Sequence, residues 1–146
     1  MHCRTAKPSD LSQLLVLYRQ LSPEDPPLEG DVAQSRWDAL LGSELTDVVV
    51  AEVDGQDVAS CVLIVVPNLT RGGRPFAVIE NVVTHSDHRR QGLGRAVLSF
   101  ACERAWAANC YKMVLTTGRS DEAVLRFYEA AGFDRDTRTC FQIRRA

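Results

Sequence analysis

The segment from Arg89 to Arg95, which is rich in glycine and arginine, has the composition of a binding site for phosphate groups. It reads R-R-Q-G-L-G-R and closely follows an apolar, β-branched run that ends at Thr84. Because glycine has no Cβ, the backbone at Gly92 and Gly94 can approach a ligand closely, and main-chain N–H groups can converge on an anion. A helix N-terminus adds partial positive charge and the arginines add full charges. The segment therefore predicts a phosphate site at a strand-to-helix turn.

The spacing of the two glycines distinguishes this segment from the common nucleotide-binding loops. The motif G-x-x-x-x-G-K-[ST] is excluded because no Lys-Ser/Thr pair follows Gly94, and G-x-G-x-x-G is excluded because Val97 stands where its third glycine would be. The segment matches the pattern [QR]-x-x-G-x-[GA], with Arg89, Gly92 and Gly94 in the defined places. An ordinary tight turn is the alternative interpretation of these six residues.

The elements that position this segment follow from the hydrophobic pattern of the chain. Helices are predicted where apolar residues recur every three or four positions, and strands where β-branched residues run together or alternate with polar ones. Asp54-Gly55 between two such runs predicts a hairpin. Ser120 or Asp121 is the expected N-cap of the last helix, and Gly132 the glycine that ends it. Strands are expected at 2–6, 46–53, 56–66, 76–84, 111–117 and 137–144, with helices at 11–21, 32–41, 94–109 and 121–131.

This order, β-α-α-β-β-β-α-β-α-β, predicts a mixed α/β domain that spans residues 1–146 without a dividing linker. A content of 45% hydrophobic and 25% charged residues is ordinary for a globular domain. The net charge of −2 argues against nucleic acid as a partner, and no apolar run approaches the ~20 residues that span a membrane. Five scattered cysteines predict reduced thiols in a cytoplasmic protein, and their spacing from the three histidines predicts no metal site.

A second motif, A-V-L-R-F-Y-E-A-A-G-F from Ala123 to Phe133, follows the first after one helix and one strand. Together the two resemble the signatures of the GNAT superfamily of acetyl-CoA-dependent N-acetyltransferases. The resemblance implies the GNAT fold, an α/β (α+β) domain with a mixed, mostly antiparallel central sheet flanked by helices. Within the superfamily, the sequence is most similar to glucosamine 6-phosphate N-acetyltransferases, at I-E-N-V-V from Ile79, Q-G-L-G from Gln91 and F-Y-E from Phe127.

The resemblance also implies where acetyl-CoA, the expected co-substrate, would bind. The backbone of Val82, Val83 and Thr84 would run beside the pantetheine arm, on a strand splayed from its neighbour. Asp121 stands where many relatives have an asparagine that touches coenzyme A. An aspartate can still cap the helix, but phosphates would repel it. The pyrophosphate would be wrapped, chiefly through backbone N–H groups, by Arg89, Arg90, Gln91, Gly92, Leu93, Gly94 and Arg95.

Acetyl transfer to an amine requires a base, a polarised carbonyl and an acid for the leaving thiolate, because an ammonium ion with a pKa of roughly 10 cannot attack. Glu80 is the candidate base, since a carboxylate buried in an apolar strand holds a proton more readily. An outward-facing Glu80, or one paired with an arginine, is the alternative. The backbone N–H of Val83 is the candidate for polarising the carbonyl. The resemblance assigns Tyr128 to the departing sulfur, whereas spacing alone would favour a tyrosine packed on a helix face.

The expected function is N-acetylation of a primary amine on a small molecule, such as an amino sugar phosphate, by direct attack in a ternary complex. A protein N-terminal or lysine acetyltransferase is one alternative, and a non-catalytic module that senses acetyl-CoA is another. No metal, nucleic acid or membrane is expected as a partner. The alternation in Thr137–Arg144 predicts an exposed edge through which two copies could form a homodimer.

Overall fold

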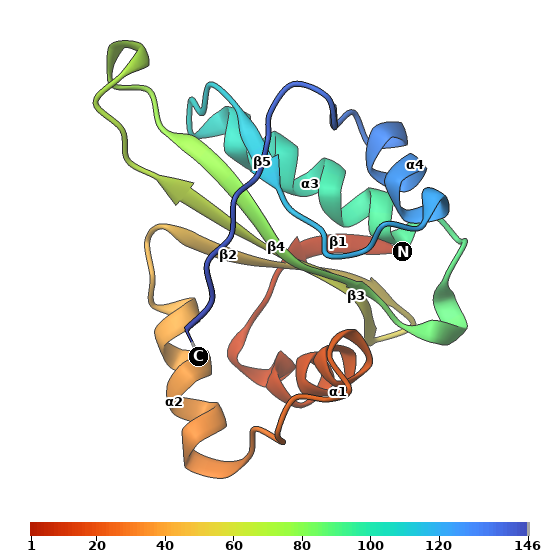
Figure 1. Cartoon of the computed structure of the whole chain (residues 1–146). Helices are drawn as coiled ribbons and strands as arrows, with labels where there is room; N and C mark the ends of the chain where they lie inside the picture. The colour runs from red at the N-terminus through yellow and green to blue at the C-terminus, as the bar shows by residue number, and fades with distance from the viewer. Residues whose placement is uncertain (146) are drawn as a thin grey trace.

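The sheet of this computed structural model, which describes residues 1–145, has five strands in the order β1-β2-β3-β4-β5 (Figure 1). All neighbours are antiparallel except β4 and β5, which are parallel. The predicted mixed, mostly antiparallel sheet flanked by helices is therefore confirmed. Three short 3-10 helices lie at Pro8–Asp10, Arg71–Gly73 and Ser86–His88. The strands and helices are β1 His2–Thr5, α1 Leu11–Leu21, α2 Gly30–Leu41, β2 Thr46–Val53, β3 Gln56–Val66, β4 Phe76–Thr84, α3 Leu93–Ala107, β5 Met113–Leu115 and α4 Glu122–Ala130.

The hairpin between β2 and β3 forms where the sequence places it, with Val53 opposite Gln56. Asp54 and Gly55 both have positive φ, 50° and 80°, as a two-residue type I′ turn requires. Local chemistry also sets the ends of α4. The Asp121 side chain accepts a hydrogen bond from the Val124 N–H, and Gly132 takes φ 96° after the last turn.

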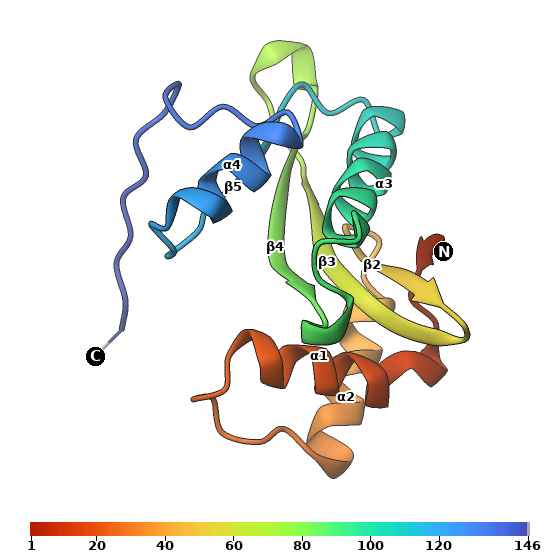
Figure 2. The same cartoon turned by 90° about the vertical axis from the view of Figure 1, so that its right-hand side faces the viewer.

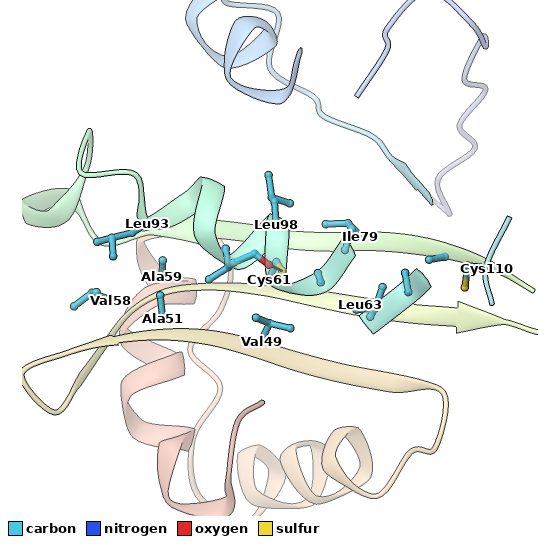
Figure 3. Packing of buried hydrophobic residues seen from close by; sticks show 14 residues of the cluster. Val49, Ala51, Val58, Ala59, Cys61, Leu63, Ile79, Leu93, Leu98 and Cys110 are labelled. Atoms are coloured by element: carbon cyan, nitrogen blue, oxygen red, sulfur yellow. Dashed lines mark hydrogen bonds between the residues drawn. The ribbon is translucent and has the colours of Figure 1, made fainter. Parts of the chain in front are cut away.

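The sheet has a hydrophobic cluster on each face, because alternate residues of its strands point in opposite directions. Val49 and Ala51 of β2 belong to the cluster beneath α3, which Figure 3 shows from close by. Val48 and Val50 belong to the cluster beneath α1 and α2. Figure 2 shows α3 and α4 on one side of the sheet and α1 with α2 on the other.

A buried ion cluster ties β1 to the hairpin and to the turn before α1. The Arg4 guanidinium donates to Asp10, to Glu52 at 2.9 Å and to Asp57 at 2.9 Å. The side chains of Asp10 and Asp57 are 2% and 0% exposed, so Arg4 neutralises two carboxylates that water cannot reach. Burial alone would raise the pKa of Asp10, but the Arg4 guanidinium and the Lys7 N–H outweigh it and lower that pKa. Burial and the neighbouring charge of Asp10 raise the pKa of Asp57.

Two expectations about the C-terminal part of the chain are wrong. The predicted strand at 111–117 is reduced to Met113–Leu115, because β4 and β5 share only three residue pairs. The predicted final strand at 137–144 does not form within residues 1–145. That segment is extended but has no neighbouring strand to complete a ladder. Of the helices among residues 1–145, none combines the length and the apolar character needed to cross a membrane.

Candidate active site

The parallel strands β4 and β5 separate after a short common stretch. Their last paired residues are Ile79 and Leu115, whereas β4 continues to Thr84. Beyond Ile79, the edge of β4 that faces away from β3 therefore has no strand partner among residues 1–145. Unpaired N–H and C=O groups at such an edge can bind an extended ligand that carries amide groups.

A β-bulge lies at the point where the strands separate. Asn81 has φ 52°, and the register of β3 against β4 shifts by one residue between the pairs Val62–Glu80 and Ser60–Val83. An extra residue of this kind bends the strand and redirects its side chains. The bulge thus turns the second half of β4 away from β5.

Glu80 is exposed, so the expectation that it is buried in the strand is wrong. Its position opposite Val62 places it on the same sheet face as α1 and α2, against which Val62 is packed. The strand is apolar around Glu80, but β5 ends beside it and the helices do not cover it. Exposure leaves this carboxylate accessible to an amine that approaches from that face.

The three residues that follow the bulge have different environments. Val83 is 6% exposed and belongs to the cluster beneath α1 and α2. Val82 is half-buried and packs against the cluster on the opposite face, which also includes Tyr128. Thr84 is half-buried, and its carbonyl accepts a hydrogen bond of 3.3 Å from Arg89 Nε. The His85 N–H donates to the Val58 carbonyl, so Val83 and Ser60, two positions along in the same register, also form a hydrogen-bonded pair, and the Val83 N–H points to β3. The N–H of Thr84 faces the unpaired edge.

The predicted phosphate-binding turn has the backbone geometry of an anion site. Arg90 and Gly92 have positive φ, 62° and 80°, and α3 begins at Leu93 with Gly92 as its N-cap. No N–H group from Arg90 to Arg95 donates a hydrogen bond to another atom of residues 1–145, and the first bond is from Ala96 to the Gly92 carbonyl. Six consecutive donors at a helix N-terminus, with exposed arginines beside them, can bind a pyrophosphate group.

The second glycine of the turn allows three elements to approach one another closely. Gly94 is buried, and a Cβ built on it would lie 3.1 Å from both Phe127 Cζ and Thr84 Oγ1. Its place is therefore fixed by contacts with α4 and β4, whereas a Cβ on Gly92 would meet nothing within 4 Å. Gly92 is needed for its left-handed backbone and Gly94 for its lack of a side chain.

We expect the substitution Gly94→Ala to lower the free energy of unfolding by about 1–3 kcal/mol, because Phe127 and Thr84 must move to admit the methyl group. Gly118→Ala is the matched control, since a Cβ there has no neighbour within 4 Å and the backbone is not left-handed. Urea denaturation of both variants measures the difference. Equal stability of the two variants would contradict the close approach.

Tyr128 is half-buried on the inner face of α4, between Phe127 and Phe133, with ring centroids at 5.0 and 6.4 Å. Burial raises the pKa of its phenol, Cys61 and Glu80 act in the same direction, and Arg119 opposes them. The phenol therefore stays protonated at neutral pH, as a proton donor must. The charge of Glu80 reaches Tyr128 although the two side chains belong to opposite faces of the sheet.

Asp121 is engaged by its own neighbours. Its carboxylate accepts a 3.3 Å hydrogen bond from the Val124 N–H and forms an ion pair of 3.1 Å with Arg119. The predicted capping role is confirmed. Since Arg119 offsets its charge, the repulsion of phosphate expected from Asp121 is reduced.

Other chemically reactive side chains lie away from the unpaired edge of β4 or are inert. Burial raises the pKa of the Cys61 thiol to about 12, so it is not a thiolate at neutral pH. A hollow of about 480 Å³ between α1, the β2–β3 turn and the turn at His85–His88 contains none of the predicted catalytic residues. Within residues 1–145, no three His, Cys, Asp or Glu side chains are placed to hold a metal ion.

Sequence reasoning missed the role of Asn81 and the contacts of Arg119. Asn81 forms the bulge, and the one signal was an asparagine, which tolerates positive φ, inside a β-branched run. Arg119 acts on both Asp121 and Tyr128, but its sequence position in a polar loop is that of an ordinary surface charge.

Comparison with known proteins decides the family. The model of the acetyltransferase (GNAT) family matches residues 11–133, which includes both motifs and every strand except β1. This chain belongs to the GNAT acetyltransferase family.

The chain is similar to several acetyltransferases, to two of them over nearly its whole length. The glucosamine 6-phosphate N-acetyltransferase of Trypanosoma brucei brucei is 37% identical over 137 residues, which cover 91% of this chain and 88% of the relative. The enzyme of that name from Schizosaccharomyces pombe is 28% identical over 89 residues, 60% of this chain and 78% of the relative. A provisionally assigned acetyltransferase from Agrobacterium tumefaciens strain C58 superposes with a TM-score of 0.95 at 47% identity, covering 99% and 100% of the two chains.

Membership in the GNAT family makes the chain an acyltransferase and supports acetyl transfer to an amine.

Proposed function

We propose that this chain transfers the acetyl group of acetyl-CoA to the primary amine of a small molecule, by direct attack in a ternary complex. The observation that carries the proposal is the continuity of the unpaired edge of β4 with the turn at Arg89–Arg95, in which the N–H groups from Arg90 to Arg95 have no hydrogen-bond acceptor among residues 1–145. An edge suited to amides leads into a site suited to a pyrophosphate, and coenzyme A carries both groups in that order.

The cofactor-binding roles follow from this continuity. The backbone of Val82, Val83 and Thr84 would pair with the pantetheine amides. The N–H groups of the turn would bind the pyrophosphate. The exposed guanidinium groups of Arg89, Arg90 and Arg95 would add positive charge beside it.

The chemistry uses groups on both faces of the sheet. Glu80 would take a proton from the acceptor ammonium, directly or through a water, and the free amine would attack the thioester carbon. The Val83 N–H that the sequence predicted for the carbonyl oxygen faces Ser60 in the β3–β4 ladder, so an N–H on the unpaired side of the strand would stabilise the negative charge that develops there. As the C–S bond breaks, Tyr128 would donate its proton to the departing thiolate. The products are the acetylated amine and coenzyme A, and no cysteine of the chain enters the reaction.

The acceptor that we propose is an amino sugar phosphate such as glucosamine 6-phosphate. Two curated relatives carry that activity in their names, and the one that is 37% identical covers most of the chain. The exposed position of Glu80 would also admit an amine on a peptide, so the test must include peptides. We further propose that the protein acts in the cytoplasm without a metal ion, and that it forms a homodimer.

The assay that tests the proposal is thiol release from acetyl-CoA across glucosamine 6-phosphate, glucosamine, amino acids, polyamines, aminoglycosides and short peptides. The signal must be corrected for the protein's own thiols, of which Cys140 is exposed. We expect turnover with glucosamine 6-phosphate that greatly exceeds turnover with glucosamine. Turnover with peptides alone would overturn the acceptor, and acetyl-CoA binding without turnover on any amine would overturn catalysis.

We expect Glu80→Gln to lower kcat/KM about 10²-fold at neutral pH, because the amide accepts no proton from the ammonium. The loss should shrink as the pH rises toward the pKa of the amine, where the acceptor is already neutral. Glu103→Gln is the control, since Glu103 is also exposed but lies on α3. A pH-independent loss would assign Glu80 to acceptor binding instead of proton transfer.

A further inference from the structure

Arg119 lies on the loop that joins β5 to α4, and both its backbone and its side chain are held in place. Its N–H donates to Thr117 Oγ1 at 3.1 Å, and its Nε donates to Asp121 Oδ2 at 3.1 Å. The side chain is nevertheless 69% exposed, and among residues 1–145 its Nη1 and Nη2 have no acceptor. A guanidinium that is oriented through one nitrogen and open at the other two can bind an anion through two parallel hydrogen bonds.

The position of Arg119 relative to Glu80 follows from the parallel pairing of β4 and β5. Their last pair is Ile79–Leu115, so the two chains leave the common stretch at the same level and in the same direction. Glu80 is the next residue on β4, and Arg119 comes four residues after Leu115, which is at most about 14 Å of extended chain. Figure 1 shows β4 continuing toward the turn before α3 while the chain after β5 runs to α4. Glu80 and Arg119 therefore lie on the two chains that border the space beyond the last pair.

The charges of these two residues both act on Tyr128. Glu80 raises the pKa of the phenol and Arg119 lowers it, in addition to the larger effect of burial. The phenol that would serve the departing sulfur is thus within electrostatic reach of one carboxylate and one guanidinium. An acceptor that reacts beside this phenol has a negative group on the β4 side and a positive group on the β5 side.

The loop between α1 and α2, on the sheet face that carries Glu80, has the opposite charge to Arg119. Residues 22–31 contain four carboxylates and neither lysine nor arginine. They are Glu24, Asp25, Glu29 and Asp31. This loop would repel an anionic substituent of the acceptor. An acceptor whose ammonium lies at Glu80 would therefore be oriented with its anionic substituent toward Arg119.

We propose that Arg119 binds the phosphate of the acceptor and so selects a phosphorylated amino sugar over the neutral sugar. This inference rests on the proposed function, because it assigns a residue to the acceptor of that reaction. The Nη1 and Nη2 groups would donate to two phosphate oxygens while the ammonium of the same molecule faces Glu80. Asp121 would act as a positioning residue that holds the guanidinium through Nε.

The ratio of kcat/KM for glucosamine 6-phosphate to kcat/KM for glucosamine tests this assignment. We expect Arg119→Gln to lower the ratio at least about tenfold, through KM for the sugar phosphate. Arg119→Lys keeps the charge without the planar fork, so it should lower the ratio less. Arg126→Gln is the matched control, since Arg126 is also exposed but pairs with Glu122 on α4, and it should keep the wild-type ratio. An unchanged ratio in Arg119→Gln would overturn the proposal, as would a loss confined to KM for acetyl-CoA.

Binding of glucose 6-phosphate, which has no amine, separates this inference from the proposed function. Calorimetry at saturating coenzyme A measures this binding with the turn at Arg89–Arg95 already occupied. We expect Arg119→Gln to weaken it about tenfold and Arg126→Gln to leave it unchanged. That result without acetylation of any amine would reject the proposed function and support the anion site. Equal binding by the wild type and Arg119→Gln, or no binding by the wild type, would reject the anion site even if glucosamine 6-phosphate is acetylated.

Discussion

Replacing Tyr128 with phenylalanine is expected to lower kcat about 10²–10⁴-fold, because the thiolate then leaves without a proton donor. The substitution removes one oxygen and keeps the ring that packs between Phe127 and Phe133, so binding of coenzyme A should change little. Single-turnover thiol release, with calorimetry of coenzyme A binding, measures the two quantities separately. Tyr111→Phe is the control, since Tyr111 is also half-buried but lies before β5.

The pH dependence of the wild type provides a second check on Tyr128. Burial raises the pKa of this phenol above its ordinary value of 10, so the protonated, active form persists as the pH rises to that value and beyond. We expect no fall in kcat from this group below about pH 10. Unchanged kcat in Tyr128→Phe would contradict the acid role. It would mean that Tyr128 contributes only through its packing against neighbouring side chains.

Replacing Arg4 with methionine should cost about 3–5 kcal/mol of folding free energy, because it leaves the carboxylates of Asp10 and Asp57 buried without their cation. Arg104→Met is the matched control. Arg104 forms an ion pair of 2.6 Å with Asp47, but their side chains are 43% and 29% exposed, so its loss should cost only about 0–1 kcal/mol. Chemical denaturation at neutral pH measures both.

The sign of the pH effect tests the same cluster. In the wild type the pKa of Asp10 is lowered, so its contribution to stability is present above its ordinary value and is lost as the pH falls through the folded value. Without Arg4, the two buried carboxylates favour their protonated forms. Lowering the pH should therefore reduce the loss of folding free energy that the substitution causes. We expect the stability gap between the variant and the wild type to narrow as the pH falls from 7 toward about 4. A constant gap would mean that Arg4 contributes through packing.

The parts of the fold that could be predicted are those set by neighbouring residues. The Asp54-Gly55 turn, the Asp121 cap and the Gly132 helix end each follow from the backbone preference of one or two residues. The turn at Arg89–Arg95 was predicted for the same reason, because glycine spacing and arginines are visible in seven consecutive positions.

The features that could not be predicted depend on partners distant in the sequence. The exposure of Glu80 results from the early end of β5, which lies more than thirty positions later in the chain. The Arg4 cluster joins residues that are 6, 48 and 53 positions apart, and no local pattern marks them. The alternation at 137–144 predicted a strand that does not form among residues 1–145, because periodicity describes a segment and says nothing of whether a neighbouring strand is present to pair with it.

The division of the core by the sheet has a consequence for how such enzymes diverge. The cluster beneath α3 supports the turn and the tyrosine that would serve the acetyl donor, and it shares no residue with the cluster around Leu14 and Trp37. Substitutions at sites without shared partners have nearly additive effects. A lineage can therefore remodel the α1–α2 side, and with it the choice of acceptor, while its descendants inherit the donor side unchanged.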